Sequence, residues 1–212
     1  MDTVMFVVVL LAIAIPAYLL GSINGAIIAS KMFYRKDIRE CGSGNPGLTN
    51  FYRVFGKRAV LLVLAIDIGK TLIPVILGGI LFYYYFDMLL FGRVVTGLFV
   101  TLGHCYPVYY GFRGGKGIMA AGTILFVIDW RVALIAWGVF VIIIVTTRFV
   151  SLGSMLGAVT YPLSLQWLEL GGDWEIALAV VYSLLVIARH HPNIKRLLHG
   201  TENRFSFSRT KE

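Results

Sequence analysis

Long apolar runs alternate with short polar stretches along the whole chain. The runs cover residues 1–31, 58–84, 93–106, 118–128, 132–147, 152–168 and 176–188. Runs that recur from end to end are typical of a polytopic membrane protein, and each run is interpreted as a transmembrane helix. The pattern therefore predicts an all-α integral membrane protein with about seven transmembrane helices, some of them tilted or partly buried because they are short.

Composition agrees with this pattern. Of the 212 residues, 58% are hydrophobic and 14% are charged, which leaves too little polar surface to cover a soluble domain of this size. No polar linker, low-complexity segment or clear repeat divides the chain, so residues 1–212 are predicted to form a single membrane-embedded domain. The first run lacks the basic start of a signal peptide and is kept as the first span.

The basic residues predict the orientation. If the N-terminus lies outside and the spans alternate, all 19 lysine and arginine residues except Lys70, Arg93 and Arg131 fall on the cytoplasmic side, Arg209 and Lys211 included. This distribution follows the positive-inside rule and places the C-terminus in the cytoplasm. With a net charge of +8, the inner surface would attract anionic lipids or anionic solutes.

Unusual polar stretches gather on the same side. They cover residues 21–24, 36–58, 103–117, 148–154 and 189–203, whereas the outer connections are short and plain. A chain that only spanned the bilayer would have no reason for this asymmetry. One shared site at the cytoplasmic boundary is the simplest interpretation.

The stretch GSGNPGLTN and the residues directly after it contain the first group of candidate residues. Its glycines permit positive φ, so that neighbouring N–H groups can converge into a nest for an anion, and a helix over 49–56 would place an amide and a guanidinium one turn apart. The alternative is an ordinary turn between two spans. The candidate residues are Gly42, Ser43, Gly44, Asn45, Thr49, Asn50 and Arg53.

The stretch FRGGKG contains the second group. Arg113 and Lys116 lie in a glycine-rich loop before a predicted helix, where N–H groups and the helix dipole favour an anion. The spacing is not that of a Walker A motif. The alternative is a pair of cations that anchors a span at the interface. Gly114, Gly115 and Gly117 complete this group.

Two further pairs have helical spacing near the inner face. His190 and Asn193 are three residues apart, and histidine is a candidate general base or hydrogen-bond donor near neutral pH. Ser151 and Ser154 are also three apart, although small residues more often allow close helix packing. The alternative for His190 is an amphipathic side chain at the interface.

The remaining polar residues have plainer interpretations. Asp67 and Lys70 are predicted to form a structural ion pair within a span. Cys41 and Cys105 both fall on the reducing inner side, which argues against a disulfide, and with the histidines they lack the spacing of a metal site. Glu202 lies in a polar tail. No serine-hydrolase elbow or zinc-protease signature occurs.

Three blocks, GSGNPGLTNFYRVFG, GHCYPVYYGFRGGKG and HHPNIKRLLHGTEN, resemble in this order the signature blocks of the bacterial acyl-phosphate-dependent glycerol-3-phosphate acyltransferases. The resemblance extends from about residue 21 to residue 203. Leu48, Tyr106 and Arg113 stand where the family usually has alanine, phenylalanine and lysine, and none of these differences removes a functional group.

The resemblance implies an enzyme of the bacterial cytoplasmic membrane whose site faces the cytoplasm. It would move an acyl group from acyl phosphate to the 1-hydroxyl of sn-glycerol 3-phosphate, giving lysophosphatidic acid and inorganic phosphate, without a covalent acyl-enzyme. No cofactor, metal or nucleic acid is expected, and the protein would work as a monomer in contact with membrane lipid. Ser43, His190 and Asn193 would be catalytic, and Glu202 would be structural. The residues that would bind substrate are Gly42, Gly44, Asn45, Thr49, Asn50, Arg53, Gly114, Gly115, Lys116, Gly117, Ser151 and Ser154. The alternative from the residues alone is a transporter of an organic phosphate or anion, which would favour an internal repeat and midplane polar groups.

Overall fold

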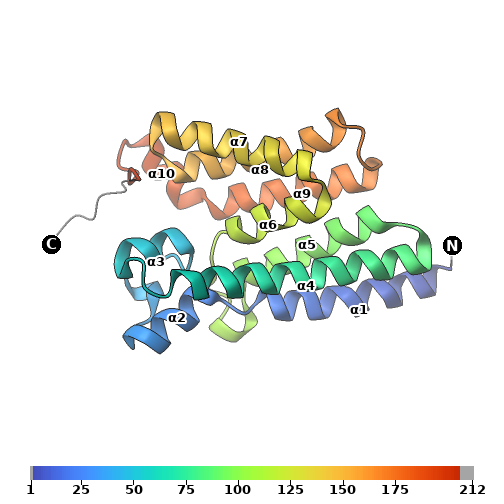
Figure 1. Cartoon of the computed structure of the whole chain (residues 1–212), viewed down its shortest axis with the longest axis horizontal. Coiled ribbons are helices and arrows are strands. Elements are labelled where there is room, and N and C mark those ends of the chain that lie inside the picture. The colour runs from blue at the N-terminus through green and yellow to red at the C-terminus, as the bar shows by residue number, and fades with distance from the viewer. Residues whose placement is uncertain (1, 206–212) are drawn as a thin grey trace. The chain divides into compact units, whose positions relative to one another are not determined.

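The protein is described here by a computed structural model that covers residues 2–205, and all regular elements in that range are helices (Figure 1). The all-α prediction is therefore confirmed. Arg209 and Lys211, predicted on the inner side, lie outside the described residues. The α-helices are α1 (Thr3–Gly21), α2 (Gly25–Tyr34), α3 (Leu48–Phe55), α4 (Val60–Phe86), α5 (Leu89–Cys105), α6 (Ile118–Ile128), α7 (Trp130–Thr147), α8 (Val150–Trp167), α9 (Asp173–Arg189) and α10 (His191–Leu198), with 3-10 turns η1 (Ile38–Glu40) and η2 (Val108–Tyr110).

The apolar runs of the sequence match the long helices closely. Helices α4 to α9 begin and end within a few residues of the predicted runs. In the described part of the chain, 4 segments are long and apolar enough to cross a membrane: Thr3–Tyr34, Val60–Phe86, Leu89–Tyr110 and Trp130–Thr147. The count of seven spans and the orientation stay predictions.

The chain divides into two compact units, Met1–Ile128 and Asp129–Glu212. In unit 1, α4 packs against α1, α5 and α6, and α1 also packs against α5. In unit 2, α8 packs between α7 and α9, and α10 follows α9 (Figure 1). The function of the whole chain as a single domain stays a prediction.

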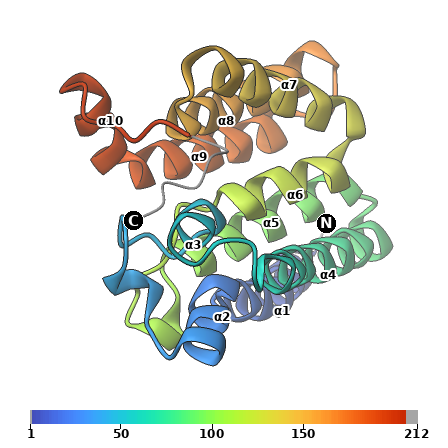
Figure 2. The ribbon, with the colours of Figure 1, turned by 60° about the vertical axis from the view of Figure 1, so that its left-hand side comes forward.

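The first predicted span is not one continuous helix. It ends at Gly21 and restarts at Gly25, because Asn24 takes an extended conformation and caps α2 by accepting the N–H of Ile27 at 2.9 Å. Helices α2 and α3 then lie at the end of unit 1 where α4 begins (Figure 2). Their shared core contains fully buried Ile27, Phe51 and Val63.

Glycines allow α1 and α5 to approach each other closely. A Cβ atom on Gly21 would collide with the carbonyl group of Val100, and one on Gly103 would collide with the carbonyl oxygen of Tyr18. Backbone atoms cannot swing aside as a flexible side chain can. The position of the end of α5, from which the 113–117 segment follows, therefore depends on these residues having no side chain.

Replacing Gly103 by alanine should destabilise unit 1. We expect Gly103→Ala to lower the free energy of unfolding by about 1–3 kcal/mol, the typical cost of overpacking a tight contact. Thermal unfolding of the detergent-solubilised protein measures the effect. Gly69→Ala is the matched control, because a Cβ on this helical glycine meets nothing within 4 Å. Equal melting temperatures for the two variants would contradict the close approach.

Candidate active site

The candidate residues fall in both units, and each group is described within its own unit. Residues 42–50, called the first loop, and residues 113–117, called the second loop, lie in unit 1. Ser151, Ser154, His190, Asn193 and Glu202 lie in unit 2.

Asn50 determines the shape of the first loop. Its side-chain oxygen accepts the N–H of Ser43 at 2.9 Å, and its amide nitrogen donates to the carbonyl of Cys41 at 3.0 Å. Gly42 and Gly44 have φ of 57° and 71°, so the positive φ predicted for these glycines is confirmed. Asn50 is buried whereas Arg53, one turn later on α3, is exposed. The side chain of Asn50 thus holds the loop, and its role in substrate binding stays a prediction.

Three N–H groups of the first loop donate within the chain, and the anion-binding nest predicted for this loop stays a prediction. The N–H of Ser43 donates to Asn50, that of Gly44 to the carbonyl of Cys41 at 3.0 Å, and that of Gly47 to the carbonyl of Asn45 at 2.9 Å. These groups close the turn on itself. Among the polar candidates of the loop, Ser43 is exposed, and Asn45 and Thr49 are half-buried.

The second loop packs on the end of α5. The N–H of Gly115 donates to the carbonyl of His104 at 3.1 Å, and a Cβ on Gly114 would collide with the same carbonyl oxygen. Gly117 has φ of 80° and lies against Thr101. The glycines are required for this approach, and α6 starts directly afterwards, as predicted. Lys116 is half-buried and Arg113 is exposed.

An ion pair between Asp37 and Arg39, called the brace, lies near the two loops and was not predicted from the sequence. The guanidinium of Arg39 donates to both carboxylate oxygens of Asp37, at 3.0 and 2.7 Å, and to the carbonyl of Tyr110 at 2.9 Å. Lys31 lies 3.4 Å from the same carboxylate. Because the Arg39 guanidinium hydrogen-bonds to it, the pKa of Asp37 lies well below its usual range, and the brace stays charged.

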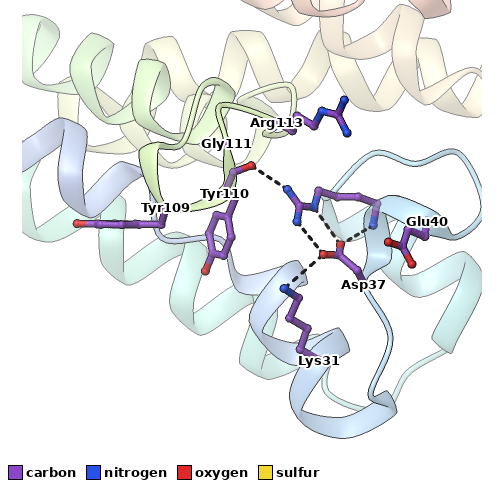
Figure 3. Close-up of a pocket in the computed structure, with 8 residues that line it drawn as sticks. Lys31, Asp37, Glu40, Tyr109, Tyr110, Gly111 and Arg113 are labelled. Carbon is purple, nitrogen blue, oxygen red and sulfur yellow. Dashed lines mark hydrogen bonds and ion pairs between the residues drawn. The ribbon is translucent and has the colours of Figure 1, made fainter.

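This brace forms one wall of a pocket of about 550 Å³ (Figure 3). Glu40 lines it from the segment before the first loop, and Tyr109, Gly111 and Arg113 line it from the segment that includes the second loop. The Asp-x-Arg spacing could have predicted the ion pair, because it brings a carboxylate and a guanidinium together locally. The bond to Tyr110, 71 residues away, has no such signal.

The predicted ion pair between Asp67 and Lys70 is confirmed. Their side chains are 2.8 Å apart and almost wholly buried. The ammonium of Lys70 also contacts the carbonyl of Ile23 at 2.5 Å and Nδ1 of His104 at 2.9 Å. Neither additional partner was predicted.

In unit 2, Glu202 gathers three donors. Its Oε1 accepts from the hydroxyl of Ser151 and the amide of Asn193, each at 2.7 Å, and its Oε2 accepts from Nε of Arg196 at 2.7 Å. The carboxylate therefore joins the start of α8 to α10, which is the kind of contact a structural residue makes. The hydroxyl of Ser154 donates to the carbonyl of Val150 at 2.8 Å.

The pKa of Glu202 reflects two opposing effects. Desolvation raises the pKa, but the hydrogen bonds from Ser151, Asn193 and Arg196 outweigh it, so the pKa lies below the usual 4.5. The carboxylate thus stays charged at neutral pH. The side-chain oxygen of Asn193 is buried without a hydrogen-bond partner.

His190 lies at the junction of α9 and α10 and is 2% exposed. Its carbonyl accepts the N–H of Asn193 at 2.8 Å, so the two residues are neighbours across the junction and not on one helix. Nδ1 of His190 is 2.7 Å from the carbonyl of Val186. A carbonyl only accepts, so Nδ1 donates, and in the neutral ring the lone pair belongs to Nε2.

Comparison with known proteins identifies the class. The sequence profile described as glycerol-3-phosphate acyltransferase matches residues 11–200. Glycerol-3-phosphate acyltransferases from Syntrophotalea carbinolica and Thermoanaerobacter pseudethanolicus are 41% and 40% identical to the chain, over 94% and 90% of its length and 97% and 93% of theirs. The crystal structure of PlsY (YgiH), an integral membrane glycerol 3-phosphate acyltransferase, in its glycerol 3-phosphate form aligns with a TM-score of 0.81 and 38% identity, over 93% of this chain and 96% of that one.

These similarities define an integral membrane acyltransferase. The chain belongs to the glycerol-3-phosphate acyltransferase family, which confirms the resemblance of its three sequence blocks.

Neutralising Glu202 should change the acid stability of the protein. A carboxyl whose pKa is lowered by folding contributes stability above its unfolded pKa, and this contribution is lost as the pH falls through the folded pKa. We expect acidification below pH 4.5 to lower the melting temperature of the wild type more than that of Glu202→Gln. The difference should be about 1 kcal/mol or less, because Arg196, the ionic partner of Glu202, is partly exposed to solvent. Glu169→Gln, at an exposed carboxylate of the same unit, is the control and should behave as the wild type.

Proposed function

We propose that the protein transfers a fatty acyl group from acyl phosphate to the 1-hydroxyl of sn-glycerol 3-phosphate. The products are lysophosphatidic acid and inorganic phosphate. The observation that carries this proposal is the family membership over residues 11–200 together with the three blocks that resemble the acyl-phosphate-dependent enzymes. The solved relative PlsY is named for its glycerol 3-phosphate and lysophosphatidic acid forms.

The proposed acyl transfer depends on positioning the two substrates and does not need a nucleophile from the protein. Acyl phosphate is a mixed anhydride and is already activated, so the enzyme has to bring a hydroxyl to the acyl carbonyl and stabilise the charge that develops there. Arg53 and Lys116 offset the negative charge of the two phosphates. Ser43, with Asn45 and Thr49, supplies hydrogen-bonding groups from the first loop.

Unit 2 supplies the orienting groups. The hydroxyl of glycerol 3-phosphate would donate a hydrogen bond to the side-chain oxygen of Asn193, which is buried without a hydrogen-bond partner. His190, held by the carbonyl of Val186, would orient the reacting groups. Oxygens of the leaving phosphate gain negative charge as the acyl bond breaks and lie next to the reacting hydroxyl, so they can take its proton. Glu202 keeps Asn193 and Ser151 in place.

The proposal includes the membrane arrangement. The N-terminus lies outside, about seven segments cross the bilayer with tilt or partial burial, and the site faces the cytoplasm of a bacterial inner membrane, where nearly all basic residues then fall. The acyl chain stays in contact with membrane lipid. One chain supplies every proposed residue, so a monomer is sufficient.

A two-substrate assay tests the reaction. Purified protein with acyl phosphate and glycerol 3-phosphate should release inorganic phosphate and form lysophosphatidic acid only when both substrates are present, and acyl-CoA should not replace acyl phosphate. Release without glycerol 3-phosphate would indicate hydrolysis instead. Uptake of glycerol 3-phosphate into sealed vesicles without acyl transfer would indicate transport.

Substitution of His190 tests where the proton goes. Glutamine can hydrogen-bond but cannot accept a proton near neutral pH, so we expect His190→Gln to keep kcat within about tenfold of the wild type with an unchanged pH profile. His190→Ala should lose more. A fall of about 10²–10⁴-fold in His190→Gln, with loss of the acidic limb of the profile, would assign the proton to His190.

A further inference from the structure

The ammonium group of Lys70 connects three segments of unit 1. An ammonium has three N–H donors, and three acceptors surround this one: a carboxylate oxygen of Asp67 at 2.8 Å, the carbonyl of Ile23 at 2.5 Å and Nδ1 of His104 at 2.9 Å. A local ion pair would need only Asp67. The other two acceptors come from positions 47 and 34 residues away in the sequence.

The bond to His104 leads to the second loop. Lysine only donates, so Nδ1 of His104 accepts, and the proton of the neutral ring lies on Nε2. The edge of the ring with Nε2 faces Gly115, since a Cβ there would collide with this atom. The carbonyl of His104 holds the N–H of Gly115 at 3.1 Å. Both the ring and the backbone of His104 therefore fix where the second loop leaves α5.

The bond to Ile23 leads to the first loop. Asn24, the next residue, donates from its side-chain amide to the carbonyl of Pro46 at 3.1 Å. The carboxylate of Asp67 accepts the N–H of Gly25 at 3.2 Å. The break between α1 and α2 is thus held on both sides of Asn24, and Asn24 in turn holds the first loop.

We propose that Lys70 is a positioning residue that sets the separation of the first and second loops. This inference rests on the proposed function, in which the two loops and the adjoining helix α3 present Ser43, Lys116 and Arg53 to the substrates. Lys70 acts through two sets of contacts, called arms. Asn24 links the helix break to the first loop, and His104 links Lys70 to the second loop. None of the three touches a substrate.

Three variants separate the two arms. Lys70→Met alone would leave the buried carboxylate of Asp67 unpaired, so the charge-neutral double variant Asp67→Asn/Lys70→Met is used. His104→Leu removes the arm to the second loop. Asn24→Ser keeps a good helix cap but is too short to reach Pro46, and so removes the arm to the first loop. Thr96→Val is the control, at a buried residue whose hydroxyl bonds within its own helix at 2.6 Å.

Limited trypsin cleavage of the folded protein reports on each loop without any need for activity. We expect His104→Leu to be cleaved faster at Arg113 and Lys116, and Asn24→Ser to be cleaved faster at Arg53, on the helix that follows the first loop. The double variant should be cleaved faster at all three sites. Cleavage at Lys195 in unit 2 should match the wild type in every variant. Each of the three test variants, but not the control Thr96→Val, should also raise KM for acyl phosphate or glycerol 3-phosphate about tenfold, with a smaller change in kcat.

The outcomes are distinct. Unchanged cleavage in the double variant, or faster cleavage at Lys195 to the same degree, would show a role in stability alone and overturn the inference. Faster loop cleavage with unchanged KM values would overturn it as well. If the wild type shows no two-substrate activity while the cleavage pattern appears as expected, the positioning stands and the proposed function fails.

Discussion

A helix that breaks among apolar neighbours must find partners for its open backbone groups, and unit 1 depends on how this is done between Gly21 and Gly25. Lys70 donates to the carbonyl of Ile23, and Asp67 accepts the N–H of Gly25. The same two side chains neutralise each other's charge, which would cost several kcal/mol if either were buried alone. The break and the ion pair therefore require each other, and the first loop takes its position from the break.

Unit 2 uses one carboxylate in a comparable way. Glu202 follows the last described helix and binds donors from the start of α8 and from α10. Its partner Arg196 is partly exposed, which makes the arrangement less costly than a fully buried pair, because solvent still screens the charge of the guanidinium. In both units a carboxylate joins segments that are distant in sequence. Asp67 binds the N–H of Gly25, and Glu202 binds the candidate residues Ser151 and Asn193 directly.

The sequence alone predicted the features that depend on local pattern. Helix ranges follow from apolar runs, and the pair Asp67–Lys70 follows from its spacing of three residues on a helix. The break at Ser22–Asn24 was missed, because an apolar run does not show where a helix loses its hydrogen bonds. The contacts of Lys70 with His104 and of Arg39 with Tyr110 were missed because they depend on how helices pack. The placing of the candidate residues around one pocket stays a prediction.

A glycine-rich composition does not by itself distinguish an anion-binding nest from a tight turn. Glycine permits both a nest and a tight turn, and here the N–H groups of Ser43, Gly44 and Gly115 donate within unit 1. In the proposed reaction, the side chains of exposed Arg53 and half-buried Lys116 would contribute positive charge to phosphate binding. Long cationic side chains tolerate small changes in phosphate position, as a reacting group requires, provided that their Cα atoms are fixed. The hydrogen bonds within the loops fix their backbone, and in the proposed reaction this would position Lys116 of the second loop and Arg53 of the adjoining helix α3.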